Sequence, residues 1–270
     1  MIGLITVNYN QYKLTEEFLG SLLTVKNCQN ISVFIADVSS KKEEFRLTKK
    51  YPFEIKISSL PNFGYAYGIN QGVKYFSESN IDKFCAINND IIFEKNFFIE
   101  AKKSFQKYDI FGGKIYYAPG FEYHKKYQKN DIGKIIWYAG GINDWKNVYT
   151  YHKGVDTVDN GQFETVEETD FITGCMLFFN KKIVDRVGLW NEKYFLYYED
   201  SDFCERAKMA GFSLIYNPKI IIWHKNAQST GGSGSKLHQK YQQKNRLIFG
   251  MKYAPFRTKL HLLKNFLFNR

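Results

Sequence analysis

Short apolar runs that end in polar residues recur through the first third of the chain and restrict its fold more than any other feature. Residues 2–7, 31–36 and 84–87 are such runs, and each is typical of a buried strand. Residues 54–58 could form a further strand, and residues 43–50 look helical. Strands that alternate with helices are joined by right-handed crossovers, so the pattern predicts an α/β fold with a mostly parallel sheet flanked by helices.

Polar side chains follow three of these strands at the points where the strands end. Asn8 follows the first strand, Asp37 the second, and Asn88, Asn89 and Asp90 the run at 84–87. Ligands of parallel sheets bind at the carboxyl ends of the strands. We therefore expect a nucleotide site at this edge of the sheet.

The glycines argue against a dinucleotide-binding or Walker-type site. No glycine occurs in VNYNQYK, which ends the first strand, and Gly64, Gly68 and Gly72 are four residues apart instead of following GxGxxG. Gly64 could supply a positive φ angle in a turn. Gly68 and Gly72 could allow a helix to approach its neighbour closely.

An acidic stretch within aromatic surroundings marks the second half of the chain. Three acids follow the aromatic residues of FLYYEDSDFC directly, namely Glu199, Asp200 and Asp202. An unpaired buried carboxylate costs several kcal/mol, so acids in this setting indicate a cleft. The alternative is that Asp200, Ser201 or Asp202 caps the helix that runs to Gly211. One cap does not need three acids.

The pattern between residues 113 and 168 is weak, and we expect a variable insert or hairpin that covers a cleft. His124, Trp145 and His152 show no ligand spacing there, and no function is expected for them. A strand at 170–179, a helix at 181–187 and two strands at 212–216 and 220–223 follow, ending at His224.

Composition restricts the cellular setting. Hydrophobic residues make up 44% of the 270, which indicates a folded chain, and the four cysteines form no CxxC pair, which favours buried thiols in a reducing compartment. We find no cleavable leader and no apolar run that could span a bilayer, so a cytoplasmic location is expected. The net charge of +11 comes entirely from the residues after Glu205, where nine Lys and four Arg occur without an acid.

The basic end of the chain predicts a separate tail. Residues 229–235 read as a flexible link and 236–250 as a helix, so we divide the chain into a domain at 1–225 and a tail at 226–270. An apolar stripe with basic flanks follows, formed by Phe256, Leu260, Leu263 and Leu267. Such a helix is typical of an anionic membrane surface, although it could instead pack on the core. Nucleic acid is not expected, because the rest of the chain is slightly acidic.

Six motifs in this order resemble the family 2 glycosyltransferases, which have the GT-A fold and transfer sugars from nucleotide donors. The closest likeness is to the bacterial rhamnosyltransferase-like subgroup, over about residues 3–224. The motifs are VNYN at 7–10, the strand end at Asp37, NFGYAYGINQG at 62–72, NND at 88–90, TGCMLFF at 173–179 and GLWNEKYFLYYEDSDFC at 188–204.

The resemblance implies a role for each matching residue. Asp200 would be the general base that deprotonates the acceptor hydroxyl in an inverting transfer, with Glu199 as the alternative. Asp90 and His224 would hold Mg²⁺ or Mn²⁺ beneath the donor diphosphate. The acceptor side would be formed by Trp190, Tyr198 and Asp202. The donor side would be formed by Thr6, Val7, Asn8, Tyr9, Asp37, Asn62, Gly64, Asn70 and Asn89.

The same resemblance implies the partners and one departure. A dTDP- or UDP-sugar would donate rhamnose or a hexose to a lipid-linked or oligosaccharide acceptor of a bacterial surface glycan, at the inner face of the cell membrane. Asn88 stands where the metal motif would have its first acid, which implies weaker or water-mediated metal binding. The alternative is a noncatalytic subunit that binds nucleotide sugars or serves as a scaffold in a glycan-assembly complex.

Overall fold

The structure is a computed structural model that describes residues 1–40, 47, 49–124, 126–226 and 236–268, without the side chains of 236–238 and 266–268. Most of the helix expected at 43–50 and all of the link expected at 229–235 lie outside the described residues.

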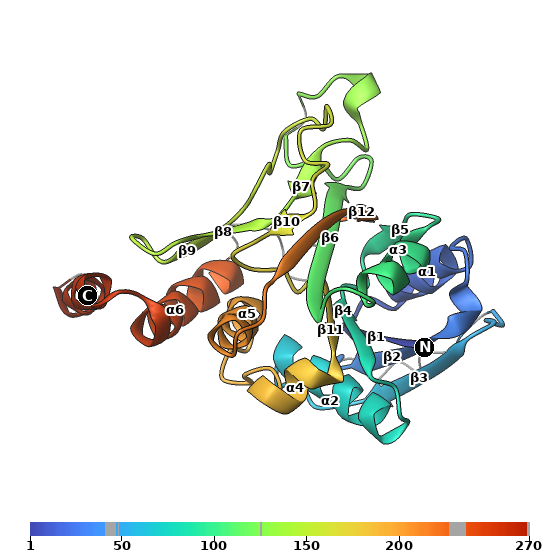
Figure 1. Ribbon diagram of the computed structural model, residues 1–270, viewed down its shortest axis with the longest axis horizontal. Helices are drawn as coiled ribbons and strands as arrows, with labels where there is room; N and C mark the ends of the chain where they lie inside the picture. Colours follow the sequence, from blue (N-terminus) through green and yellow to red (C-terminus); the bar gives the residue numbers. More distant parts are fainter. Residues whose placement is uncertain (41–46, 48, 125, 227–235, 269–270) are drawn as a thin grey trace.

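A ten-stranded sheet forms the centre of the molecule (Figure 1). Its strands are β1 (Ile2–Asn8), β2 (Ile31–Asp37), β3 (Glu54–Ser59), β4 (Lys83–Ile87), β5 (Ile91–Phe93), β6 (Ile110–Tyr117), β7 (Ile136–Tyr138), β10 (Glu167–Glu168), β11 (Met176–Asn180) and β12 (Ile215–His224). The order is β10-β12-β6-β11-β4-β1-β2-β3, with β5 paired to β12 and β7 to β6. Strands β4, β1, β2 and β3 run parallel, as expected, whereas β11 runs antiparallel to both of its neighbours.

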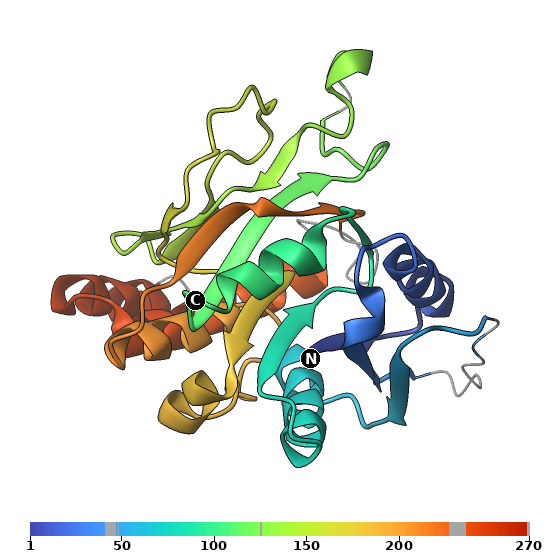
Figure 2. The ribbon, with the colours of Figure 1, turned by 45° about the vertical axis from the view of Figure 1, so that its right-hand side comes forward.

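Helices cover both faces of the sheet (Figure 2). The helices on the sheet are α1 (Tyr12–Leu22), α2 (Tyr65–Glu78), α3 (Phe97–Ser104), α4 (Lys181–Val187) and α5 (Glu199–Met209), with short 3₁₀ turns at Cys28–Asn30 and Lys129–Asp131. Two further helices, α6 (Lys236–Tyr253) and α7 (Phe256–Phe268), lie to one side of the sheet. Successive side chains of a strand point to opposite faces. In β11, Phe178 accordingly meets Phe97 of α3, while Phe179 meets Phe203 of α5. The predicted α/β class is confirmed.

Close approach of α2 to the sheet explains its glycines. A Cβ at Gly72 would lie 2.4 Å from the Ile5 side chain, and one at Gly68 would lie 2.6 Å from that of Val7. Both contacts are shorter than a real Cβ accepts, so the expected role of these glycines in helix packing is confirmed.

The expectation that regular structure weakens at residue 113 was wrong, because β6 continues to Tyr117. The strand was missed because Gly112, Gly113 and Lys114 interrupt its apolar pattern. A Cβ at Gly113 would lie 2.2 Å from the Ile220 carbonyl oxygen of β12, so glycine is required there. Lys114 is buried because its ammonium pairs with Asp159 at 2.7 Å and with Glu164.

Two other strand predictions need correction. The strand expected at 170–179 begins only at Met176, and the residues before it form a turn in which Met176 N donates to the Thr173 carbonyl at 3.1 Å. The two strands expected at 212–216 and 220–223 form the one strand β12, whose register against β6 shifts between Asn217 and Ile221. Pro218 lies inside that shift, where a strand tolerates a residue without an N–H group.

The predicted hairpin is present within the region 113–168. Its strands, β8 (Gly141–Asp144) and β9 (Tyr149–His152), pair antiparallel with each other. A second hydrophobic cluster joins Val148 between these strands to Tyr194 and Tyr198 before α5 and to Phe249 and Leu262 of the two last helices. The C-terminal helices therefore hold the hairpin against the start of α5.

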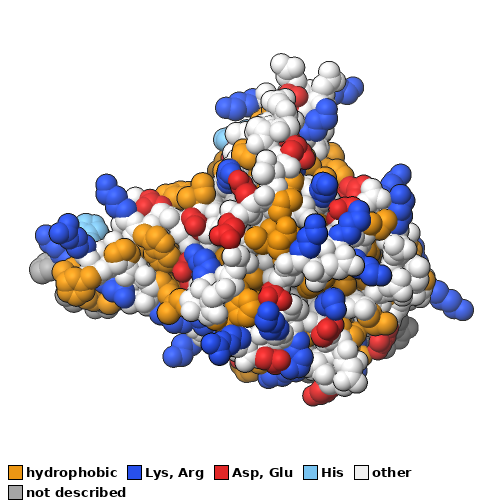
Figure 3. All heavy atoms as spheres, viewed as in Figure 1, with side chains coloured by type: hydrophobic (Ala, Val, Ile, Leu, Met, Phe, Trp, Pro, Cys, Tyr) orange, Lys and Arg blue, Asp and Glu red, His pale blue; other side chains and the backbone are white. Residues whose placement is uncertain are grey.

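The last helix has two different faces. Leu262 of α7 is buried and approaches Gly250 of α6, whereas Phe256, Leu260 and Leu263 are 74%, 52% and 40% exposed. Hydrophobic and basic side chains lie next to each other at this end of the molecule (Figure 3). Within the parts of the chain that the structure describes, none of the helices has the length and apolar character needed to cross a membrane. The division at residue 225 remains a prediction.

Candidate functional site

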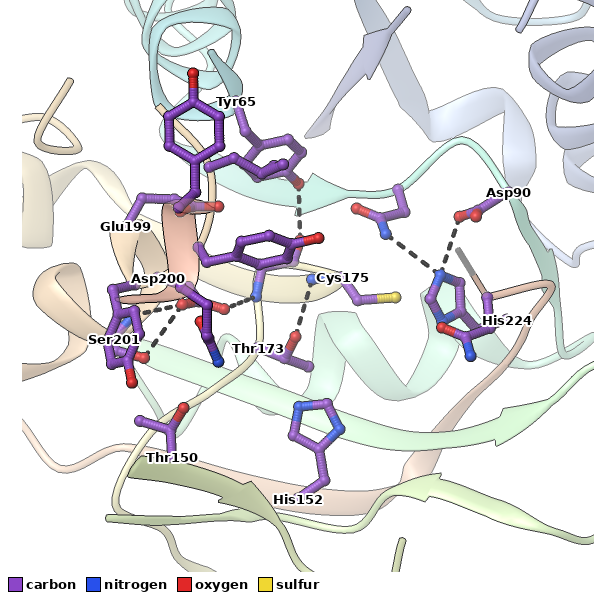
Figure 4. Close-up of a pocket in the computed structure, with 18 of the residues that line it drawn as sticks. Tyr65, Asp90, Thr150, His152, Thr173, Cys175, Glu199, Asp200, Ser201 and His224 are labelled. Carbon is purple, nitrogen blue, oxygen red and sulfur yellow. Dashed lines mark hydrogen bonds and ion pairs between the residues drawn. The ribbon is translucent and has the colours of Figure 1, made fainter. Parts of the chain in front are cut away.

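A cavity of about 820 Å³ opens at the carboxyl ends of β1 and β4. Its walls come from the start of α2, the turn before β11, the first turn of α5, the inner face of β9 and the end of β12 (Figure 4). Many predicted site residues line it, namely Val7, Tyr9, Asn62, Gly64, Asn89, Asp90, Tyr198, Glu199, Asp200 and His224. No lysine or arginine lines it among the described residues.

A network of hydrogen bonds among the strand-end side chains lies beside the donor side of the cavity. The register of β1 on β2 places Asn8 beside Asp37, and Asn8 Nδ2 donates to Asp37 Oδ1 at 2.9 Å. Asn89 Nδ2 donates to Thr15 Oγ1 at 2.8 Å and to Asn8 Oδ1 at 3.3 Å. The three strand ends thus meet as the sequence predicts. Asn8, at 1% exposed, orients its neighbours rather than lining the cavity.

Asp90 and His224 meet at the far end of β12. His224 Nε2 lies 3.1 Å from Asp90 Oδ1, and the Asn88 side chain lies 3.4 Å from the same nitrogen. Both residues are almost fully buried, at 6% and 3% exposed. The antiparallel pairing of β12 with β5 places His224 opposite Ile91 and so next to Asp90.

This pair fits a divalent cation. Adjacent ligands of an octahedral ion with bonds of about 2.1 Å lie about 3.0 Å apart, close to the observed separation. Carboxylate oxygen suits both Mg²⁺ and Mn²⁺, and imidazole nitrogen is a ligand of first-row transition metals. Over the described ranges, no group of three or more His, Cys, Asp and Glu side chains is arranged to hold a metal ion. The pair therefore suits a cation that takes its other ligands from phosphates and water.

The acids of α5 enter the cavity through strained backbone. Tyr197 and Tyr198 both have φ angles of +70°, and Tyr198 is the N-cap residue without a side-chain cap. The expectation that Asp200, Ser201 or Asp202 caps this helix was therefore wrong. With the turn placed in this way, Glu199 and Asp200 both face the cavity from the first turn of the helix.

Asp200 is held by backbone donors. Its Oδ2 accepts from Gly174 N at 2.8 Å, and its Oδ1 accepts from Ser201 N at 2.7 Å. Burial raises the pKa of Asp200 above its ordinary value, against the lowering effect of these two bonds. The TGC motif before β11 therefore orients the Asp200 carboxylate through Gly174 N. The loop that contains this motif is itself held by Tyr65, whose hydroxyl donates to the Gly174 carbonyl at 2.8 Å.

Glu199 lies beside Asp200 in a different environment. Its Oε2 is buried and forms no hydrogen bond with any described residue. Burial and the neighbouring Asp200 charge raise the pKa of Glu199 well above its ordinary value. Glu199 is therefore protonated more readily than Asp200.

Six predicted site residues lie outside the cavity lining. Asp202 is fully buried on the opposite side of α5, where it binds Arg206, Lys252 and Tyr253 at 2.8 Å each. Burial opposes ionisation of Asp202, but these partners lower its pKa below the ordinary value. The others are Thr6, Asn8, Asp37, Asn70 and Trp190.

Asn70 and Trp190 instead join the acidic loop to α2. Asn70 Nδ2 donates to the Trp190 carbonyl and Asn70 Oδ1 accepts from Trp190 N, both at 2.9 Å. The Trp190 ring packs on Phe203 of α5 at 5.2 Å between centroids. These residues determine where the loop lies, and they do not face the cavity.

His152 and Trp137 line the cavity, although no function was expected for His152. The Trp137 ring lies between two imidazoles, at 4.3 Å from His152 and 4.6 Å from His224. Burial lowers the pKa of His152 to about 4. The alternation of Tyr149, Thr150, Tyr151 and His152 is a strand signal that could have placed Thr150 and His152 on one face.

Comparison with known proteins gives consistent results. The sequence profile described as "Glycosyl transferase family 2" matches residues 4–188, and that described as "Glycosyl transferase family group 2" matches residues 117–269.

Two relatives illustrate the similarity at sequence level. A low-salt glycan biosynthesis hexosyltransferase of Haloferax volcanii is 22% identical over 216 residues, which are 79% of this chain and 63% of the relative. An N-acetylglucosaminyl-diphospho-decaprenol L-rhamnosyltransferase of Mycobacterium tuberculosis is 32% identical over 79 residues, which are 29% of this chain and 25% of the relative. The matched segments thus span less than two thirds of either relative.

Solved structures share the fold. A mannosyltransferase from Pyrobaculum calidifontis in complex with GDP-Man and Mn²⁺ superposes with a TM-score of 0.60 at 12% identity, over 98% of this chain and 69% of that one. GalNAc-T7 with UDP, GalNAc and Mn²⁺ gives 0.63 at 12% identity, over 90% and 47%. The expected GT-A fold is confirmed.

Replacing Glu199 with Gln should stabilise the protein in a pH-dependent manner. The folded-state pKa of Glu199 is raised, so the stability that its neutral form contributes is present below the ordinary value of 4.5 and is lost as pH rises through the folded value. The variant stays neutral. The difference between its unfolding free energy and that of the wild type should be near zero at about pH 4. Above pH 4 this difference should grow by up to about 1.4 kcal/mol per pH unit.

Urea unfolding at several pH values measures this difference. Glu78→Gln is the matched control, because Glu78 is exposed at the end of α2, and its difference from the wild type should be flat with pH. A Glu199→Gln difference that is equally flat would contradict the buried, proton-binding state of this carboxyl.

Proposed function

The chain belongs to glycosyl transferase family 2, and on that basis we propose that it moves a sugar from a nucleotide-diphosphate donor to a hydroxyl group of a glycan acceptor. One observation carries the proposal. Asp200 and the Asp90–His224 pair face the same cavity at the carboxyl ends of the parallel strands. A cavity of about 820 Å³ has the size of a small-molecule site.

Charge supports a metal-assisted reaction. A donor diphosphate needs cationic neutralisation, and no lysine or arginine lines the cavity among the described residues. Asp90 and His224 would hold Mg²⁺ or Mn²⁺, with Asn88 beside them in place of a second acid. The cation supplies electrostatic stabilisation of the diphosphate as it leaves.

Asp200 is the proposed general base. Its two backbone hydrogen bonds fix the carboxylate, and its raised pKa brings its basicity closer to neutral pH, where a base works best. The acceptor hydroxyl gives its proton to Asp200, its oxygen bonds to the anomeric carbon, and the nucleotide diphosphate leaves from the opposite side. A single displacement of this kind inverts the anomeric configuration. Glu199 is less suited, because burial and the Asp200 charge raise the pKa of its carboxyl well above the ordinary value and so favour the neutral form.

The donor would lie on the β1–β4 side of the cavity. Val7, Tyr9, Asn62, Gly64 and Asn89 line that side. The names of the relatives support transfer of a rhamnosyl or hexosyl group. The proposed nucleotide is dTDP or UDP, and the proposed acceptor is lipid-linked or an oligosaccharide.

The exposed face of α7 supports contact with the inner, anionic surface of the cell membrane. Phe256, Leu260 and Leu263 form an outward apolar stripe, and Arg257, Lys259 and Lys264 accompany it. Apolar insertion and attraction to anionic lipids act together in such helices.

Donor and metal binding can be tested with nucleotide sugars in a thermal-shift assay. A true donor at about 100 Kd should stabilise the protein by about 2.7 kcal/mol, and only with Mn²⁺ or Mg²⁺ present. Asp90→Asn should remove most of the metal-dependent part. Full stabilisation of this variant by donor and metal would contradict the role of Asp90, and the absence of any donor response would contradict the proposed function.

Asp200→Asn should lower the rate of sugar transfer by about 10²–10⁴-fold, because it removes the base without changing the shape of the site. Donor-induced stabilisation should persist. Asp185→Asn on α4 is the control, because Asp185 is exposed and outside the cavity, and its turnover should equal that of the wild type. Equal turnover in Asp200→Asn would exclude Asp200 as the base.

Membrane binding can be tested by sedimentation with anionic vesicles. Replacing Phe256, Leu260 and Leu263 together with Ser should reduce binding on the order of tenfold or more, because their buried apolar area is lost. Met209→Ser is the control, since Met209 is 77% exposed on a different helix. Point variants are preferable to truncation at residue 252, because Lys252 binds the buried Asp202. Unchanged binding of the triple variant would contradict the proposed surface.

A further inference from the structure

We infer that the inner face of β9, formed by Thr150 and His152, is the acceptor-binding wall of the cavity. It takes an uncharged sugar unit that carries a second free hydroxyl beside the one that Asp200 activates. The inference rests on the proposed function and specifies the acceptor class and the residues that recognise it.

The position of β9 places this wall opposite the reacting groups. Alternate residues of a strand share a face, and Thr150 and His152 are partly buried whereas Tyr149 and Tyr151 are exposed. In Figure 4 the two side chains point from β9 into the cavity, toward Asp200 and Thr173. An acceptor between β9 and α5 would therefore touch both walls.

The hydrogen bonding of His152 determines which group it can receive. Its Nδ1 lies 3.0 Å from the Trp137 carbonyl oxygen, which can only accept, so Nδ1 carries the hydrogen. In a neutral imidazole the other nitrogen is then an acceptor. Burial keeps this ring neutral at physiological pH. Nε2 at the tip of the ring thus requires a ligand that donates a hydrogen bond.

Packing of the His152 ring keeps Nε2, the hydrogen-bond acceptor, in place. The His152 ring meets the faces and edges of Trp137 at 4.3 Å and Tyr138 at 5.2 Å. Between β8 and β9, Trp145 stacks on Phe249 of α6 at 5.5 Å, and the Val148 carbonyl accepts from the Tyr198 hydroxyl at 3.0 Å. The wall is therefore fixed relative to α5.

The two walls select a polyhydroxylated, uncharged acceptor. Asp200 and His152 each need a hydroxyl donor, and Thr150 can bond a third group as donor or acceptor. A lipid alcohol or a serine side chain has one hydroxyl and would satisfy only Asp200. An acidic sugar would meet the Asp200 carboxylate, and no lysine or arginine lies on the described lining to compensate. Trp137 offers aromatic surface to a sugar ring.

The test compares acceptors and His152 variants with the full-length protein and the donor found by thermal shift. The probes are octyl β-D-glucoside and octyl N-acetyl-β-D-glucosaminide, with octan-1-ol as the alcohol without a sugar. Wild-type protein should transfer to at least one glycoside and not measurably to octanol. Preferred transfer to octanol, or to neither glycoside while donor is hydrolysed, would overturn the inference.

His152→Asn keeps a hydrogen-bond donor near the Trp137 carbonyl but removes the group at the Nε2 position. His152→Gln instead places a polar group at the Nε2 position. His152→Asn should raise the acceptor KM about tenfold, and His152→Gln should recover much of that loss. The donor KM and the slow hydrolysis of donor by water should change less than about twofold in both. An unchanged acceptor KM in His152→Asn, or equal loss of donor hydrolysis, would overturn the assignment.

The outcome separates this inference from the proposed function. If wild-type protein neither hydrolyses nor transfers from any donor, the proposed function fails and the inference with it. If wild-type protein transfers sugar and His152→Asn has the wild-type acceptor KM, only the acceptor-binding wall is wrong.

Discussion

The backbone at Tyr197 and Tyr198 is the constraint on which the site depends. Two consecutive non-glycine residues with left-handed φ angles cost about 1–2 kcal/mol each, and they persist because neighbouring elements hold them. Asn245 of α6 donates to the Leu196 and Tyr197 carbonyls at 2.8 and 3.0 Å, and Tyr65 N donates to the Phe195 carbonyl at 3.0 Å. This turn places Glu199 and Asp200 in the cavity and directs Asp202 away from it.

Asp202 shows why three successive acids have different roles. One turn of helix divides its residues between two sides, so Asp200 faces the cavity while Asp202 faces α6. There it is balanced by Arg206 and Lys252, and a buried carboxylate with such partners is tolerated. Asp202 thus connects α6 to α5, the helix that carries the proposed base, and the basic end of the chain contributes to the structure of the site.

An aromatic contact connects the two ends of the cavity. Trp137 lies between His224, beside Asp90, and His152 on β9. The Trp137 ring packs on both imidazoles. The backbone carbonyl of Trp137 determines which nitrogen of His152 carries the hydrogen. The metal side and the acceptor-binding wall are therefore parts of one packed unit built from β7, β9 and β12.

The sequence by itself determined the alternation of strands and helices, the polar ends of β1, β2 and β4, and the acidic first turn of α5, because these depend on local periodicity and on the cost of buried charge. It did not reveal β6, since Lys114 and its glycines are explained only by partners far away in the chain. Only the tertiary structure decided that Thr150 and His152 face Asp200. Those residues are about fifty positions apart, and packing of the hairpin on the C-terminal helices, which no local pattern encodes, brings them together.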